Sequence, residues 1–334
     1  MAFAEKTMVL GQDGNNAASS VKCLLCKGEM IPDESGNLKC TVCGYVKKAE
    51  HKVGPGSIVA GKYRVLNALG SGGCGEIFLC HPLDNVGVRY ALKVHRDLSN
   101  SSASLQRFER EAQLLKQLNA NRVIVDLIDF WSDESAAYMI LEYITGQNLK
   151  MAREKYEFDE LMTLQIAHEV CYALSYAWET LHLVHRDIKP ENIMLDNEGY
   201  IRLLDFGMSK SLDESDGGLT LMKTGLGTPG YMSPEQFLEA KNVDFRTDLF
   251  SLGATMYFAL VGRPPFEGKN SVERYQNTIA NTPPPMESLT PAYCSPECAD
   301  LIRRLMAKEA DDRPDSYESV LQEIRALISR FEQE

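Results

Sequence analysis

The chain carries His185-Arg186-Asp187-Ile188-Lys189-Pro190-Glu191-Asn192, followed thirteen residues after Asn192 by Asp205-Phe206-Gly207. The first stretch contains an Asp that can act as a base, a Lys and an Asn, and the second stretch adds another carboxylate. Phosphoryl transfer requires this set, because a hydroxyl must be oriented, developing negative charge must be neutralised and Mg²⁺ must be held by oxygen atoms. The two motifs at this spacing are not expected by chance. They therefore predict a phosphoryl-transfer site.

At these motifs the chain resembles the eukaryotic-like (Hanks-type) Ser/Thr protein kinase family, and the resemblance extends from Gly61 to the end of the chain. It implies an α+β fold with two lobes. We expect a β-rich small lobe over residues 61–143 and a helical large lobe over residues 144–332. The resemblance also implies that ATP is the phosphoryl donor and that proteins are the substrates.

Charge assigns roles to the catalytic residues. Asp187 is predicted to accept or orient the proton of the substrate hydroxyl, and Lys189 to neutralise the transferring phosphoryl group. Asn192 and Asp205 offer the hard oxygen ligands that Mg²⁺, or Mn²⁺ in its place, prefers. Because no catalytic position is substituted, we expect an active enzyme. The alternative is a scaffold that binds nucleotide without transferring phosphate.

A glycine-rich segment precedes these motifs and reads Leu69-Gly70-Ser71-Gly72-Gly73-Cys74-Gly75-Glu76-Ile77. The same glycine spacing occurs in dinucleotide-binding folds, but those require a helix next. Here the sequence continues as a strand to Cys80, and the next predicted strand, Arg89–Val94, supplies Lys93. This order predicts a hairpin whose backbone covers phosphates while a lysine reaches their oxygens. The candidate ATP-binding residues here are Gly70, Gly72, Gly75, Ile77 and Lys93.

An amphipathic helix follows, and it offers Lys93 an anionic partner. Glu111 lies on the same helical face as the apolar residues Leu105, Phe108, Ala112, Leu115 and Leu118. A carboxylate on a buried face is costly unless it is paired. We therefore expect Glu111 to pair with Lys93.

Two further strands are predicted over Val123–Leu127 and Tyr138–Tyr143, and a long helix over Asp159–Trp178. The kinase resemblance implies that backbone groups of residues 142–144 face the adenine. Glu142 is therefore a candidate nucleotide contact.

The resemblance also implies scaffold residues in the large lobe. Thr228, within Gly227-Thr228-Pro229-Gly230-Tyr231, is expected to hydrogen-bond near Asp187 and Lys189. Glu235 is expected to pair with Arg313.

Regulation is expected in the segment between Asp205 and Glu235. Arg186 pairs in this family with a phosphate on that segment. The resemblance implies a principal phosphorylation site four residues before Thr228, so Thr224 is the first candidate and Thr220 the second.

A second motif lies near the start of the chain, where Cys23 and Cys26 form one Cys-x-x-Cys pair and Cys40 and Cys43 form another. Two such pairs can complete a tetrahedral S₄ site, and the pattern resembles a zinc ribbon. Two redox pairs, two disulfides or an iron site are the alternatives. A piece this small needs the metal to fold.

The chain thus divides into a flexible tail over residues 1–20, a zinc-ribbon-like domain over residues 21–48, a linker over residues 49–60 and a kinase domain over residues 61–332. The ribbon is a possible docking site for protein substrates. Residues 21–60 contain six Lys and four acidic residues, so nucleic-acid binding is the weaker expectation.

Composition agrees with a globular enzyme. The chain has 334 residues, 44% of them hydrophobic, and a net charge of -12, which argues against nucleic acid as a partner. Nine cysteines, an odd number, fit a reducing compartment better than a disulfide framework. We find neither a signal-peptide pattern nor a run of apolar residues long enough for a bilayer, so we expect a cytoplasmic protein without membrane contact.

Overall fold

The computed structural model describes residues 23, 26–32, 38–47, 53–72, 75–96, 103–133, 136–206, 210–211, 230–238, 243–285 and 294–332. The chain divides after Lys52 into two compact units, which we describe separately. The predicted tail over residues 1–20 lies outside the described residues.

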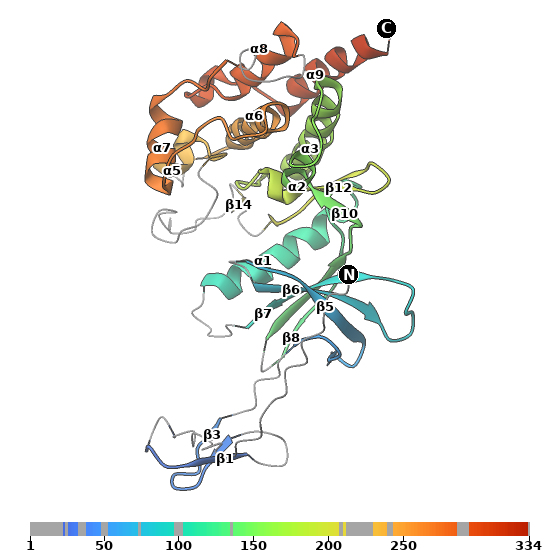
Figure 1. Cartoon of the computed structure of the whole chain (residues 1–334), viewed down its shortest axis with the longest axis vertical. Helices are drawn as coiled ribbons and strands as arrows, with labels where there is room; N and C mark the ends of the chain where they lie inside the picture. The colour runs from blue at the N-terminus through green and yellow to red at the C-terminus, as the bar shows by residue number, and fades with distance from the viewer. Residues whose placement is uncertain are drawn as a thin grey trace, which may run out of the picture. The chain divides into compact units, whose positions relative to one another are not determined.

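The second unit begins with a six-stranded antiparallel sheet, in the order β4-β5-β6-β7-β9-β8 (Figure 1). Its strands are rich in β-branched and aromatic residues, which favour a pleated, half-buried surface. The bounds are β4 Ile58–Val59, β5 Tyr63–Gly72, β6 Gly75–Pro82, β7 Tyr90–His95, β8 Leu127–Ser132 and β9 Ala137–Glu142.

This sheet is strongly curled. The ring of Tyr63 on β5 stacks on that of Trp131 on β8, with centroids 5.9 Å apart, and its hydroxyl donates to Asp129 at 3.3 Å. β8 is the edge strand at one end of the sheet and β5 is the second strand from the other end, so only a curled sheet brings them together. A buried apolar cluster fills the curl, with Val65, Phe78, Leu92, Val94 and Ile140 among its members.

Residues before Gly61 contribute to this sheet. The backbone N–H of Gly56 donates to Val65, and the N–H of Val65 donates to Ser57, at 2.8 and 2.9 Å. The unit starts at Val53. The later part of the predicted linker over residues 49–60 is therefore a sheet edge.

Helix α1 (Ala103–Leu118) covers the face of the sheet near β8 and β9. Its buried residues include Phe108, Leu115 and Leu118, which confirms the predicted apolar face. The predicted strand over Val123–Leu127 was wrong in its bounds, because β8 starts only at Leu127. Residues 123–125 instead exchange backbone hydrogen bonds with Leu203 of the large lobe, and burial between the lobes explains their apolar character.

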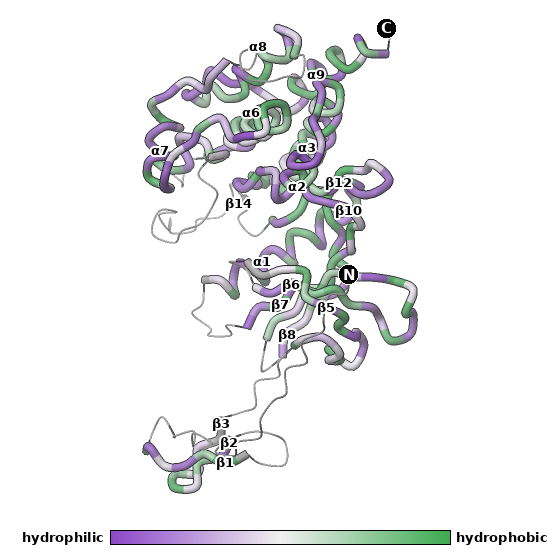
Figure 2. Tube along the Cα trace, in the orientation of Figure 1, coloured by the Kyte–Doolittle hydropathy of each residue, from purple (hydrophilic) through white to green (hydrophobic). Residues whose placement is uncertain are grey.

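The large lobe is helical (Figure 1). Long helix α3 starts after Asp159, whose carboxylate caps Met162 N–H, and it extends three residues beyond the predicted end at Trp178. Helix α6 is buried along nearly its whole length, and Figure 2 shows its apolar character. The helices are α2 Leu149–Arg153, α3 Glu160–Leu181, α5 Pro234–Leu238, α6 Arg246–Val261, α7 Ser271–Ala280, α8 Pro296–Leu305 and α9 Tyr317–Phe331, with 3₁₀ turns η1 Pro190–Asn192 and η4 Ala310–Asp312.

Short strands lie where the sheet meets these helices. β10, β12 and β13 form one antiparallel sheet, and β11 pairs with β14. The two predicted motifs lie beside these strands: residues 185–192 follow β11 and end in η1, and Asp205 comes two residues after β13. Their bounds are β10 Gly146–Asn148, β11 Leu183–Val184, β12 Ile193–Asp196, β13 Ile201–Leu203 and β14 Lys210–Ser211.

The first unit contains a small three-stranded sheet, in the order β1-β2-β3, with the bounds β1 Met30–Pro32, β2 Leu38–Cys40 and β3 Val46–Lys47. Its buried cluster consists of Cys23, Met30 and Cys40. So small a cluster cannot stabilise a fold by burial alone.

Candidate active site

A cleft of about 480 Å³ lies between the sheet and the large lobe. Apolar side chains from both lobes line one part of it, and charged side chains line the other. The lining includes Leu69, Ile77, Ala91, Val125, Leu141, Met194 and Leu204 on the apolar part, and Lys93, Glu111, Glu191, Asn192 and Asp205 on the charged part. An apolar slot ending in ionic groups suits a flat base attached to phosphates.

The predicted glycine-rich hairpin covers this cleft. Gly70 pairs with Ile77, and Gly72 with Gly75, across β5 and β6. Gly75 has a φ of +128°, and a Cβ there would lie 2.2 Å from the carbonyl oxygen of Val94. Only glycine fits this position, so the close approach of β6 to β7 depends on it. Gly73 and Cys74 lie outside the described residues.

Lys93 projects from β7 and contacts Glu111 of α1. Its Nζ lies 2.7 Å from each carboxylate oxygen of Glu111 and 3.7 Å from Oδ1 of Asp205. Lys93 and Glu111 are both buried. Burial raises the pKa of Glu111 to about 7, while the ammonium of Lys93 opposes the shift. These three groups therefore connect β7, helix α1 and the segment that follows β13.

Asp187 is the centre of a second cluster. Its Oδ2 accepts hydrogen bonds from Lys189 Nζ at 2.6 Å and Asn192 Nδ2 at 3.0 Å. Asn192 Nδ2 also donates to the backbone oxygen of Asp187 at 2.8 Å. Burial raises the pKa of Asp187, and the nearby Lys189 opposes this. A carboxyl group with a raised pKa is better suited to accept a proton than an exposed Asp.

The oxygen atoms present fit a divalent cation. Because Nδ2 of Asn192 is used by Asp187, its Oδ1 is the amide atom that can bind a metal. The side chain of Asp205 remains about a third exposed, with a relative accessibility of 32%. An amide oxygen and a carboxylate are the ligands that Mg²⁺ takes beside phosphate and water.

The backbone at both motifs is strained. Arg186 has a φ of +69° and Asp205 a φ of +60°, a region that non-glycine residues seldom adopt. Asp248 of α6 holds the first motif, because its carboxylate accepts the N–H of His185 at 2.7 Å and of Arg186 at 2.8 Å. Strain maintained by a buried anchor is characteristic of functional sites.

His185 packs beside this anchor. Its ring makes an edge contact with Phe206, and its Nε2 lies 3.2 Å from the oxygen of Leu204. Its Nδ1 accepts the N–H of Asp187 at 3.3 Å. The neutral ring with a proton on Nε2 satisfies both contacts. Burial lowers its pKa to about 4.

Glu142, the last residue of β9, lies in the hinge, the segment that joins the two lobes. It has a side-chain partner that the sequence did not indicate. Its Oε1 lies 3.1 Å from Nε of Arg202 on β13, and its Oε2 accepts the N–H of Asp126. The carboxylate is thus used to brace the hinge. The expected contact of adenine with the backbone of residues 142–144 remains a prediction.

The predicted scaffold pair is present. Arg313, with its side chain fully buried, donates from Nη1 and Nη2 to Glu235 at 2.7 and 2.9 Å. Thr220, Thr224 and Thr228 lie outside the described residues, so the expectations for them remain predictions.

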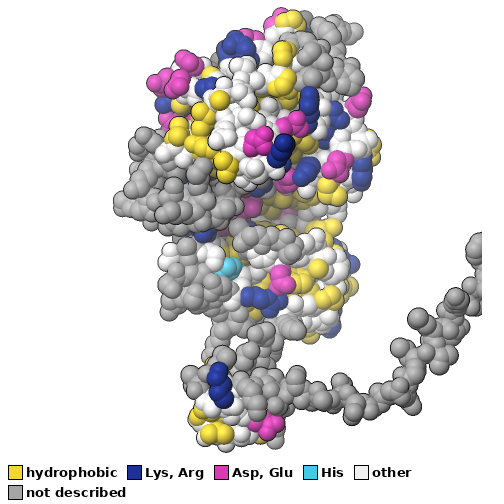
Figure 3. Space-filling view, turned by 60° about the vertical axis from the view of Figure 1, so that its left-hand side comes forward, with side chains coloured by type: hydrophobic (Ala, Val, Ile, Leu, Met, Phe, Trp, Pro, Cys, Tyr) yellow, Lys and Arg dark blue, Asp and Glu magenta, His cyan; other side chains and the backbone are white. Residues whose placement is uncertain are grey.

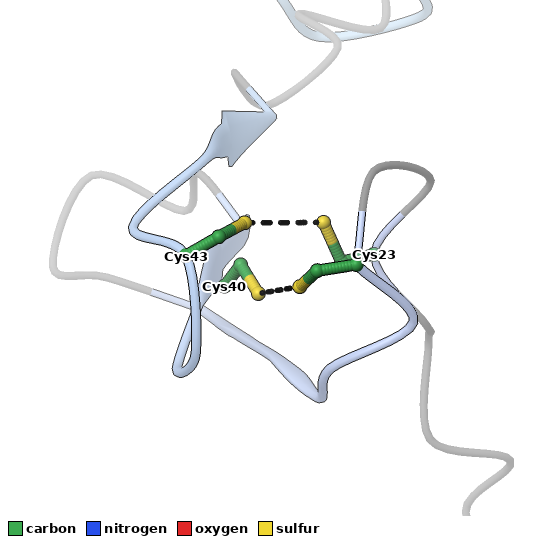
Figure 4. A group of neighbouring side chains, drawn as sticks. Cys23, Cys40 and Cys43 are labelled. Atoms are coloured by element: carbon green, nitrogen blue, oxygen red, sulfur yellow. Dashed lines mark hydrogen bonds between the residues drawn. The ribbon is translucent and has the colours of Figure 1, made fainter.

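In the first unit the four predicted cysteines converge, and Figure 4 shows Cys23, Cys40 and Cys43 among them. The Sγ atoms of Cys23 and Cys43 are 3.7 Å apart, those of Cys26 and Cys40 are 3.4 Å apart, and all four lie within 4.8 Å of one another. Zn–S bonds of about 2.3 Å place tetrahedral sulfurs about 3.8 Å apart. The thiol arrangement therefore fits a zinc ion.

Comparisons with known proteins agree with this site. A family model described as "Protein kinase domain" matches residues 63–324. Similar curated proteins are "Serine/threonine-protein kinase pkn3" of Myxococcus xanthus, 34% identical over 81% of this chain and 51% of its own length, and "Probable serine/threonine-protein kinase PknB" of Bifidobacterium longum, 33% identical over 78% of this chain and 38% of its own. "Serine/threonine-protein kinase PknB" of Mycolicibacterium smegmatis is 32% identical over 75% and 40%.

The chain belongs to the protein kinase family. It spans about half, or less, of the length of the curated relatives that it matches.

The surface gives two further observations. Figure 3 shows basic and acidic side chains interspersed over the large lobe on the face in view. Among the described residues, no helix is both long enough and apolar enough to span a bilayer.

Proposed function

We propose that this chain is an ATP-dependent Ser/Thr protein kinase, which transfers the γ-phosphoryl group of ATP to Ser or Thr hydroxyls of proteins. The observation that carries the proposal is the joint geometry of two clusters at one cleft: Lys93 with Glu111 and Asp205, and Asp187 with Lys189 and Asn192. The names of the relatives support the class of acceptor.

The residues divide the reaction between them. Lys93, oriented by Glu111, binds phosphate oxygens of ATP. Asp187 orients the acceptor hydroxyl and takes its proton as the oxygen attacks the γ-phosphorus and the bond to the ADP oxygen breaks. Lys189 neutralises negative charge on the transferring group. Asn192 and Asp205 would hold Mg²⁺, or Mn²⁺, which when bound neutralises the phosphates.

The test compares the wild-type chain with Asp187→Asn. With ATP and Mg²⁺, the wild type should phosphorylate itself or a generic protein substrate. The phosphorylation rate of Asp187→Asn should be lower by roughly a thousandfold or more, which is within the range that a positioned general base contributes to a rate. Both proteins should bind ATP. Nucleotide binding with equal inactivity of both chains would instead support a scaffold without catalysis.

We further propose that the four cysteines bind zinc and that this unit docks protein partners. Three apolar side chains support docking, since Ile31, Val42 and Tyr45 are 50%, 72% and 38% exposed. We also propose that the chain acts in the cytoplasm, because none of the eight cysteines that the structure describes is in a disulfide. A reducing compartment preserves that state.

A further inference from the structure

A buried group of side chains in the large lobe has the composition of a metal site, and the proposed reaction uses none of them. The group consists of Glu160, Cys294 and Cys298, whose two sulfur atoms and a carboxylate oxygen all lie within 4.8 Å of one another. The relative accessibilities are 3% for Glu160, 8% for Cys294 and 0% for Cys298. All three side chains are therefore more than nine-tenths buried.

The three side chains come from segments that are far apart in the sequence. Glu160 is the first residue of α3, and the two cysteines flank the start of α8, where Ser295 is the N-cap. Oε2 and Oε1 of Glu160 accept hydrogen bonds from the backbone N–H and the hydroxyl of Ser295, at 2.5 and 2.7 Å. The same hydroxyl accepts the N–H of Cys298 at 3.2 Å. Ser295 thus orients the carboxylate beside the thiols, as the hydrogen-bonded outer partner of a metal ligand does.

The buried charge of Glu160 is not balanced by a basic side chain. Within the described part of the chain its hydrogen-bond partners are the N–H and hydroxyl of Ser295, which are both uncharged. The N-terminus of α8 adds only a partial positive charge. A buried carboxylate is costly unless it is paired with a cation, as Glu111 is paired with Lys93. A metal cation beside the two thiols would supply that charge.

The donor atoms favour zinc. Zn²⁺ accepts thiolate sulfur and carboxylate oxygen in one site, whereas Mg²⁺ and Ca²⁺ take oxygen ligands. Zn–S bonds of about 2.3 Å and Zn–O bonds of about 2.0–2.2 Å place tetrahedral ligand atoms roughly 3.5–3.8 Å apart. Atoms within 4.8 Å of one another reach this spacing through side-chain movements of about 1 Å. Three protein ligands leave the fourth position to water.

A disulfide between the two cysteines is the other product that their proximity allows. Neither cysteine is in a disulfide in this structure. Cysteines that respond to oxidants are accessible to solvent, whereas these two are buried. A disulfide would also leave the carboxylate of Glu160 without a cation. Metal binding accounts for all three side chains together.

We propose that Glu160, Cys294 and Cys298 form a zinc site that joins the start of α3 to the start of α8. The site goes beyond the proposed kinase function and does not depend on it. Because the zinc ion would connect segments about 135 residues apart, its binding should stabilise the large lobe.

The test first removes the zinc site proposed in the first unit. In a parent variant, the four cysteines of that unit are all replaced by Ser. After purification under reducing conditions, addition of zinc and removal of unbound metal, the parent should contain one zinc ion per chain by elemental analysis. Adding Cys294→Ala and Cys298→Ala should remove this ion. The zinc affinity should fall by more than the roughly 10- to 100-fold that loss of an outer partner costs.

The matched control is Cys171→Ala in the same parent. It removes a thiol that is equally buried, also on α3, but lies outside the cluster. This variant should keep its zinc. ATP titration checks that the kinase unit of each variant is folded.

A second measurement needs no substitution in the large lobe. Co²⁺ in place of zinc should give the parent the charge-transfer absorption of cobalt–thiolate bonds, and this spectrum decides the matter if the variant at both cysteines fails to bind ATP. A parent that lacks the zinc or this absorption would overturn the proposal. Zinc that persists in a folded variant without the two cysteines would also overturn it, as would a Cys294–Cys298 disulfide by mass in fresh reduced lysate.

Discussion

Asp248, buried on α6, accepts the backbone N–H of Arg186 at 2.8 Å, directly before Asp187, the proposed catalytic base. The same carboxylate accepts the N–H of His185. The hydroxyl of Tyr317 also donates to this carboxylate, at 3.3 Å, so Asp248→Asn leaves one acceptor oxygen for three donors. An unsatisfied buried donor costs about 1–3 kcal/mol, so we expect kcat to fall roughly 10- to 100-fold with ATP affinity little changed. Peptide phosphorylation and ATP titration measure the two effects.

The control for that substitution is Asp300→Asn, which changes a half-exposed carboxylate on α8. It should behave as wild type. A wild-type kcat in Asp248→Asn would show that the N–H groups do not need the carboxylate.

His185 should make stability depend on pH. Its pKa is about 4 in the fold, against 6.5 for an unperturbed side chain. Between these values the unfolded chain binds a proton that the folded chain does not. The stabilisation is therefore complete above pH 6.5 and is lost as pH falls toward 4, by on the order of 3 kcal/mol. Urea unfolding from pH 7.5 to 4.5 should show a shallower dependence for His185→Gln than for wild type. Identical slopes for wild type and His185→Gln would contradict the assignment.

The first unit, which contains the four converging cysteines, should bind one zinc ion per chain. Replacing Cys40 and Cys43 by Ser removes two of the four converging thiols and should release the metal. ATP binding should remain, because the apolar clusters of the kinase unit lie within residues 53–332. Elemental analysis and ATP titration test both parts. Val42→Ser, at an exposed residue between these cysteines, should keep the zinc; a metal-free wild type with two disulfides by mass would reject the site.

Thr224 is predicted to be autophosphorylated. A phosphate adds a charge of about -1.5 to -2, which can pair with Arg186 and order the segment. Thr224→Ala should therefore lower turnover far more than ATP affinity. Peptide mapping of active enzyme locates the phosphate, with Thr220 as the second candidate. Full activity with both threonines unmodified would be incompatible with the prediction.

Contacts inside periodic elements could be predicted from the sequence. Lys93 lies on a strand and Glu111 on the apolar face of a helix, so the cost of a buried charge was enough to pair them. The Glu235–Arg313 pair followed from family resemblance alone, because 78 residues separate its members.

Contacts made by irregular segments could not be predicted. Arg202, which contacts Glu142, lies in a short hairpin, and Lys150, which contacts Glu191, lies in a helix of five residues. Segments this short have no periodic pattern that predicts where their side chains point. The strand predicted over Val123–Leu127 failed for a related reason. A short apolar run signals burial, but it does not say whether the partner is the sheet or the other lobe.

The short strand β4 has a practical consequence for shortened versions of this chain. The family match starts at Tyr63, yet β4 and Ser57 pair with residues 63–65 of β5. A fragment cut at the family boundary would leave the backbone groups of β5 open to a neighbouring molecule, which invites edge-to-edge association. A fragment that starts at Val53 keeps that edge covered.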